Sequence, residues 1–175
     1  MLKKVCGILS SLLLIILAFV AAALILPHFF GYQTMAVLSG SMEPNIGVGS
    51  IAYVKEAPFD ELKVGDVISF HMGSDTVVTH RIKDVDLEKQ LITTKGDANE
   101  VEDAEPVAAS SVIGKVGFHI PLLGYISIYA KTPLGIAGIC GIFIVLILLV
   151  FLPEIFSKEE KKVTKKETKK ETKKE

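Results

Sequence analysis

Residues 66–85 read DVISFHMGSDTVVTHRIKDV, and this stretch decides the fold class. It contains two runs rich in Val, Ile, Thr and Phe, residues 66–72 and 76–85, on either side of a Gly-Ser-Asp turn at 73–75. Short runs of β-branched and aromatic residues bounded by Gly and Asp are typical of β-strands. The stretch therefore predicts two strands joined by a turn.

Similar runs lie on both sides of this pair. The other candidate strands are residues 35–39, 50–55, 90–95 and 111–118, with turn material such as residues 43–49 between them. Alternation of apolar and polar residues is the pattern of half-solvated antiparallel strands. We therefore predict a mainly β fold, with a small antiparallel β domain over residues 27–133.

Two long apolar segments enclose this domain. Residues 6–26 and 134–152 contain no charged residue, and about 20 apolar residues suffice for a helix to cross a bilayer. Both are predicted to be transmembrane helices. The first also has features of a cleavable signal sequence, because Lys3 and Lys4 precede it and small residues lie at 21–23. Its apolar run exceeds the roughly 7 to 15 residues of a signal sequence, which favours an uncleaved anchor.

Charge is distributed unevenly along the chain. Nine lysines and five glutamates lie in residues 157–175, whereas residues 27–133 carry eight Lys and Arg against fourteen Asp and Glu. Lysine-rich flanks stay in the cytoplasm. Residues 1–5 and 153–175 are therefore predicted to be cytoplasmic, and the acidic domain to lie outside a cell membrane that the chain crosses twice. The Lys/Glu-rich tail is predicted to be disordered, with attraction of its lysines to anionic lipid headgroups as the functional alternative.

The residue inventory excludes several kinds of site. Cys6 and Cys140 both fall in the apolar segments, so the outer domain is expected to have neither a disulfide nor a thiolate zinc site. No metal and no cofactor are expected. Basic residues concentrate in the tail rather than on a folded surface, which argues against nucleic-acid binding.

A hydroxyl nucleophile is the main remaining route to catalysis. Ser41 lies in SGSMEP, after a predicted strand, and Gly40 would permit a bend that presents the hydroxyl at the strand end. A serine needs a positioned base to take its proton. His80 is the best of four histidines, because alternation in TVVTHRI places it on the apolar face of its strand. A histidine that is only part of the core would show the same pattern.

An acid that orients the histidine would complete such a site. The sequence KGDANEVED, residues 95–103, supplies Asp97 and Asp103. Asp97 lies in a turn-like sequence and Asp103 in an acidic loop. Spacing alone does not choose between them.

Taken together, these residues resemble signal peptidase I, in particular the endoplasmic-reticulum type that is also present in archaea and some Gram-positive bacteria. SGSMEP resembles the nucleophile box of that family, and GDVISF resembles one of its strands. VVTHRI resembles the box in which this branch has histidine and the common bacterial branch has lysine, and KGDANEVED resembles the acidic box. The motifs follow the order of the family over residues 39–103, and the anchor on each side of the β domain is also similar.

The resemblance implies a serine endopeptidase that removes N-terminal signal peptides from exported preproteins by cleavage after small residues. It implies that Ser41 is the nucleophile, His80 the general base and acid, Asp103 the orienting acid, Asp97 a residue needed for geometry, and Ser39 an oxyanion-hole donor. The implied partners are the signal peptides of preproteins, membrane lipid and the secretion machinery.

Two other functions fit parts of the pattern. A processing protease with a Ser-Lys dyad would need Lys83 or Lys95 as its base. A catalytically silent membrane scaffold would use the β domain to bind exported peptides, although Ser41 and His80 together with two aspartates argue against that function.

Overall fold

The computed structural model describes residues 2–73 and 76–151. Ser74 and Asp75 of the predicted turn, Leu152 of the second predicted helix and the predicted tail at 153–175 lie outside the described residues. The chain divides into two compact units, Ala23–Thr132 and the two terminal parts Met1–Ala22 and Pro133–Glu175.

Two helices are long and apolar enough to cross a membrane. They are Lys4–Phe29, within α1 (Leu2–Phe29), and Pro133–Phe151. At a rise of 1.5 Å per residue their lengths are about 39 and 28 Å, close to the ~30 Å thickness of a hydrocarbon core. The protein itself covers almost none of their side chains. Apolar helices flank the β domain in the sequence, as predicted.

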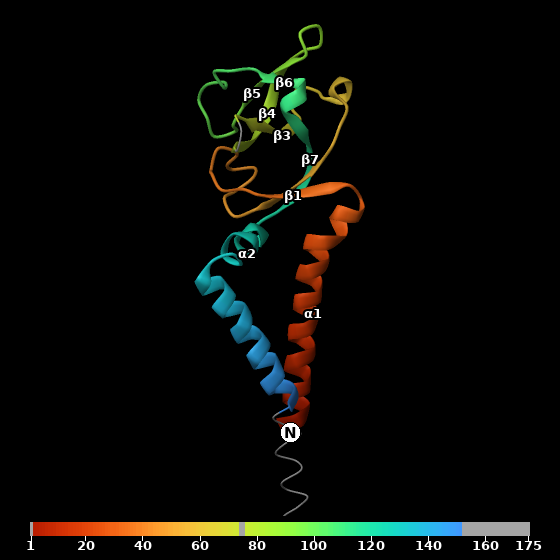
Figure 1. The fold of residues 1–175 in the computed structure, drawn as a ribbon, viewed down its shortest axis with the longest axis vertical. Coiled ribbons are helices and arrows are strands. Elements are labelled where there is room, and N and C mark those ends of the chain that lie inside the picture. The colour runs from red at the N-terminus through yellow and green to blue at the C-terminus, as the bar shows by residue number, and fades with distance from the viewer. Residues whose placement is uncertain (1, 74–75, 152–175) are drawn as a thin grey trace, which may run out of the picture. The chain divides into compact units, whose positions relative to one another are not determined.

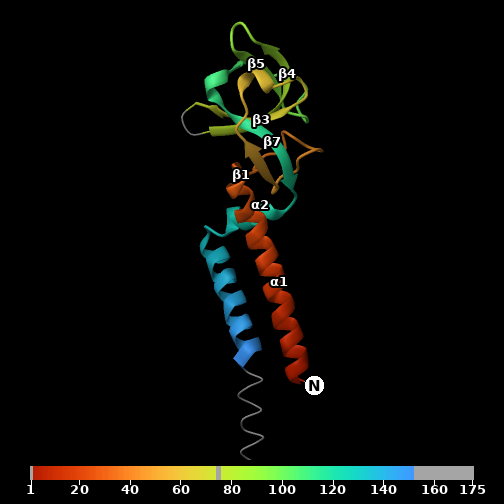
Figure 2. The same ribbon diagram turned by 90° about the vertical axis from the view of Figure 1, so that its right-hand side faces the viewer.

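A seven-stranded antiparallel sheet forms the second unit (Figure 1). Its strands are β1 (Tyr32–Ala36), β2 (Ile51–Lys55), β3 (Val67–Met72), β4 (Thr76–Asp86), β5 (Leu91–Lys95), β6 (Val107–Ala108) and β7 (Val112–Ile120). The order across the sheet is β1-β2-β7-β3-β4-β5-β6. Three short helices, η1 (Phe59–Glu61), η2 (Ala109–Ser111) and α2 (Leu123–Tyr129), complete the unit. The sheet is curled rather than flat (Figure 2), and the prediction of an antiparallel β domain is confirmed.

Alternating apolar residues of the central strands fill the core. The main cluster consists of Leu62, Ile68, Phe70, Ile82, Ile92 and Val107, which are at most 5% exposed. Burying each such side chain contributes about 1.5–3 kcal/mol. The same alternation buries His80, which lies two residues before Ile82 on β4 and is 7% exposed.

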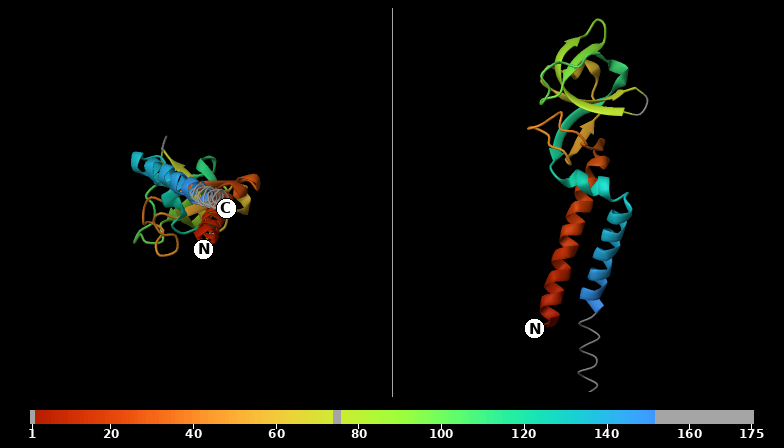
Figure 3. Two further views of the ribbon diagram at one scale, coloured as in Figure 1. Left: turned by 90° about the horizontal axis from the view of Figure 1, so that it is seen from below. Right: turned by 90° about the vertical axis from the view of Figure 1, so that its left-hand side faces the viewer.

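Strand β7 joins the two halves of the sheet, because it pairs with β2 on one edge and with β3 on the other. It continues toward α2 (Figure 3). A Cβ atom added to Gly114 would lie 2.3 Å from the carbonyl oxygen of Lys55, so only glycine permits this close approach of β7 to the end of β2.

The first predicted strand, residues 35–39, was placed three residues too far along the chain. β1 pairs with β2 from Tyr32↔Lys55 to Ala36↔Ile51, and it ends before Leu38, which is 72% exposed. The first residues of β1 are mostly polar, so they do not show the apolar pattern that predicts a strand. The apolar residues that follow β1 belong to the loop. β6 and α2 were not predicted, because β6 has two residues and α2 has seven.

Candidate active site

Ser41 lies in the loop between β1 and β2. Two backbone hydrogen bonds form turns in this loop. The Glu43 N–H donates to the carbonyl oxygen of Gly40 (3.0 Å), and the Ile46 N–H donates to that of Met42 (2.8 Å). Met42 and Ile46 are buried and anchor the loop to the core, while Ser41 stays partly accessible. The chain bends at Gly40, as expected, and the turn that follows contains Ser41. Gly40 is not one of the glycines with a positive φ, so this bend does not depend on the conformational freedom of glycine.

His80 and Asp103 form a close pair. The Nδ1 atom of His80 lies 2.6 Å from Oδ2 of Asp103, and the two side chains are 9% and 12% exposed. A carboxylate accepts hydrogen bonds and does not donate them, so Nδ1 carries the proton. Nε2 is then the ring nitrogen that is free to accept a proton. Among the two aspartates left open by the sequence, the structure places Asp103 beside the imidazole.

Asp97 has a different set of partners. It accepts hydrogen bonds from Nε and Nη2 of Arg81 (2.7 and 2.6 Å) and from Nδ2 of Asn45 (2.8 Å). Arg81 also donates to the carbonyl oxygen of Gly65 (2.7 Å). The hydrogen bond from Arg81 lowers the pKa of Asp97 below its usual value, and the bond from Asn45 acts in the same direction. Asp97 is thus an ionised group that links the loop of Ser41 to strand β4.

The loop that begins at Gly96 also contacts the backbone of Ser41. The Ala98 N–H donates to the carbonyl oxygen of Ser41 (2.9 Å). A Cβ atom added to Gly96 would lie 2.6 Å from that same oxygen. The Ala98 N–H therefore bonds to the main chain of Ser41, and the close approach of Gly96 leaves no room for a side chain at that position.

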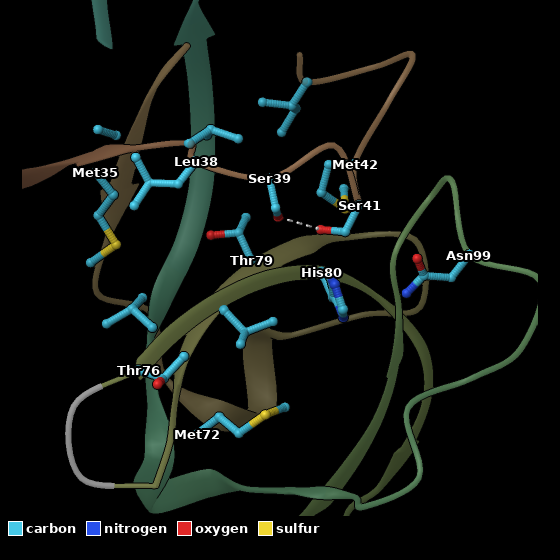
Figure 4. Close-up of a pocket in the computed structure, with 15 residues that line it drawn as sticks. Met35, Leu38, Ser39, Ser41, Met42, Met72, Thr76, Thr79, His80 and Asn99 are labelled. Atoms are coloured by element: carbon cyan, nitrogen blue, oxygen red, sulfur yellow. Dashed lines mark hydrogen bonds between the residues drawn. The ribbon is translucent and has the colours of Figure 1, made fainter. Parts of the chain in front are cut away.

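A cavity of about 730 Å³ brings these elements together (Figure 4). Its lining includes Ser39, Ser41, His80 and Asn99, together with apolar residues of the loop after β1 and of the first half of β4. The Oγ atoms of Ser39 and Ser41 are 3.3 Å apart. Lys83 and Lys95 do not line this cavity, and Lys95 donates to the carbonyl oxygen of Glu100 (2.9 Å). The geometry therefore does not support the Ser-Lys alternative.

Sequence reasoning missed several residues of this site, namely Thr94, Arg81 and Asn45. Thr94 donates from Oγ1 to Oδ2 of Asp103 (2.6 Å) and is fully buried. The sequence does indicate its burial, because Thr94 lies two residues after the apolar Ile92 and strand alternation places both side chains on the same face. No local pattern in the sequence identifies Arg81 or Asn45, because their partner Asp97 lies 16 and 52 residues away, respectively. Within residues 2–73 and 76–151, no cluster of three His, Cys, Asp or Glu residues is arranged to hold a metal ion.

Comparison with known proteins identifies the family. The family described as signal peptidase, peptidase S26, matches residues 8–118. Signal peptidase I W of Bacillus subtilis is 46% identical over 101 residues, which cover 54% of this chain and 52% of that protein. The signal peptidase complex catalytic subunit SEC11 of Lodderomyces elongisporus is 32% identical over 123 residues (62% of this chain, 74% of that protein), and that of Candida albicans is 31% identical over 127 residues (62% and 76%).

The chain thus spans about half the length of the bacterial relative and about three quarters of the yeast relatives. The matched segment contains Ser41, His80, Asp97 and Asp103, together with all residues that line the cavity. The resemblance to the endoplasmic-reticulum type is confirmed by the similarity to SEC11. This chain belongs to the signal peptidase family S26, whose members are serine endopeptidases.

Proposed function

We propose that this chain is a membrane-bound signal peptidase that removes N-terminal signal peptides from preproteins, with Ser41 as nucleophile and His80 as general base. The observation that carries the proposal is the His80–Asp103 pair at 2.6 Å, in which His80 lines the same cavity as Ser41. A histidine held by a carboxylate through Nδ1 presents Nε2 as the base, the arrangement that serine hydrolases use. The names of the relatives supply the substrate class.

The proposed reaction proceeds in two steps. Ser41 Oγ attacks the scissile carbonyl carbon while His80 Nε2 takes its proton, and Ser39 and the backbone N–H of Ser41 stabilise the oxyanion. The imidazolium then protonates the leaving amine, which releases the mature protein and leaves an ester on Ser41. Water, deprotonated by His80, hydrolyses that ester and frees the signal peptide. Asp103 stabilises the imidazolium in both steps.

Strand β4 offers the substrate an edge. Its first half pairs with β3 from Met72↔Thr76 to Val67↔Arg81, but its pairing with β5 begins only at Arg81↔Lys95. Within the described part of the chain, residues 76–80 therefore have one unpaired edge, and all five line the cavity. An extended peptide that adds to this edge would pass beside His80. We propose this edge as the substrate site. We also propose cleavage after small side chains, as the resemblance to signal peptidase I implies.

Asp97 is proposed to act as a positioning residue. Its ion pair with Arg81 and its hydrogen bond with Asn45 hold the chain segment that contacts the carbonyl oxygen of Ser41. Asp97 lies outside the cavity lining, so this role is exerted through the backbone of Ser41.

The membrane topology belongs to the same proposal. Lysines at both ends of the chain and the acidic middle favour a cytoplasmic location of both termini and an outer β domain. A protease added to intact cells should cut near Gly73 and spare the KKET tail. Loss of the tail from intact cells would contradict this topology.

The activity test uses the full chain purified in detergent and a preprotein with its signal peptide. Ser41→Ala and His80→Ala should each lower kcat by at least about 10³-fold, as in other hydroxyl–histidine enzymes. His119→Ala is the matched control, because His119 does not line the cavity, and it should leave cleavage unchanged. Equal cleavage by wild type and a folded Ser41→Ala variant would refute the proposal. Cleavage by the purified chain would also establish that other components of the secretion machinery are not required.

A further inference from the structure

We propose that Thr94 is a positioning residue that fixes the carboxylate of Asp103 toward His80. The inference rests on the proposed function, since it adds a residue to the same site. Thr94 is not among the residues that line the cavity with Ser41 and His80. Its effect on the reaction would pass through Asp103.

Asp103 needs such support because of where it lies. It belongs to the segment between β5 and β6, which has no regular secondary structure from Gly96 to Pro106. Thr94 holds it at two points. The carbonyl oxygen of Thr94 accepts the Asp103 N–H (2.9 Å), and the Thr94 hydroxyl donates to Oδ2 of Asp103 (2.6 Å). One residue of a sheet strand therefore fixes both the main chain and the side chain of the acid.

Both donors meet on one oxygen. Oδ2 of Asp103 accepts from Thr94 Oγ1 and from His80 Nδ1, each at 2.6 Å. A carboxylate oxygen has two lone-pair directions. When the Thr94 hydroxyl occupies one of them, the other is directed at the imidazole ring. Rotation of the carboxylate away from His80 would break both hydrogen bonds together.

The position also argues against a purely structural threonine. Thr94 is fully buried and pairs with Ile82, on the same face of the sheet as His80. A buried hydroxyl lowers stability unless it is hydrogen-bonded, and Val would fill the same volume without that requirement. Thr93 lies on the opposite face, opposite Asp84, and is partly accessible. It provides a control of identical chemistry one residue away.

The test compares Thr94→Val, Thr94→Ser and Thr93→Val in the detergent-solubilised full chain with a signal-peptide-bearing preprotein. Thr94→Val should lower kcat/KM about 10- to 100-fold, the range for loss of one hydrogen bond to a charged group, mainly through kcat. Thr94→Ser keeps the donor and should remain within about threefold of wild type. Thr93→Val should not change the kinetics. If Thr94→Val does not fold, Thr94→Cys, which has a weaker donor, replaces it and should show a similar loss.

A double-mutant cycle separates positioning from packing. In the Asp103→Asn background, Thr94→Val should lower kcat/KM by less than about threefold, because the carboxylate through which Thr94 acts is already absent. An equal loss in both backgrounds, or a folded Thr94→Val enzyme with full activity, would overturn the role of Thr94. Those results leave the proposed function intact as long as Ser41→Ala is inactive. Activity of Ser41→Ala equal to that of wild type would instead reject the proposed function itself.

Discussion

Replacement of Asp97 by Asn tests how the loop of Ser41 is held. The carboxylate is 9% exposed and accepts three side-chain hydrogen bonds, two of them from Arg81, which is 27% exposed. Removal of one partner from a buried ion pair costs about 3–5 kcal/mol. Water can reach part of Arg81, and the amide oxygen of Asn keeps one acceptor. We therefore expect Asp97→Asn to destabilise the β domain by about 2–3 kcal/mol at neutral pH.

The effect should depend on pH in a defined direction. The hydrogen bond from Arg81 lowers the pKa of Asp97 in the folded protein. Its contribution to stability is then fully present above the unfolded value of about 3.9 and is lost as the pH falls through the lower folded value. The stability difference between wild type and Asp97→Asn should be constant from pH 7 to about pH 5 and shrink below about pH 4.

Pulse proteolysis in urea, with the full chain in detergent micelles, measures this difference through cleavage of the unfolded β domain. Asp84→Asn is the matched control, because Asp84 is exposed on the same strand as Arg81. The reasoning is refuted if Asp97→Asn costs no more than Asp84→Asn, or if the difference persists undiminished at pH 3. Activity should fall together with stability, because the segment that contacts Ser41 loses its anchor.

Three further outcomes are expected. Gly96→Ala should destabilise the domain by about 1–3 kcal/mol and lower kcat/KM, because the added Cβ would lie 2.6 Å from the carbonyl oxygen of Ser41. Gly47→Ala is the control. Its added Cβ meets nothing within 4 Å, so this variant should be neutral in the same unfolding assay. Ser39→Ala should keep its fold by circular dichroism and lose about 10²-fold in kcat, as for an oxyanion-hole donor; full activity would remove Ser39 from the site. In a pH profile, kcat/KM should rise between about pH 5 and 7.5, as expected for a histidine base, and a rise only above about pH 8.5 would indicate a lysine base.

Several parts of the site were predictable because they depend on local pattern. Alternation in TVVTHRI predicted that His80 lies on the buried face of its strand, and the structure places it there with 7% exposure. The position of Ser41 in the loop after the first strand was also readable, although that strand ends at Ala36 rather than Ser39. Strand ends are set by pairing with β2, which single-strand periodicity does not report.

The sequence by itself determined the two long apolar helices, the antiparallel β class and the residue types available for chemistry. Each of these follows from composition or periodicity over neighbouring residues. The tertiary structure decided which aspartate meets His80, because Asp103 is 23 residues away and is held by Thr94 on another strand. It also decided that Asp97 pairs with Arg81 instead. Such partners depend on strand register and on the path of a loop, and both are fixed only when the whole sheet buries its core.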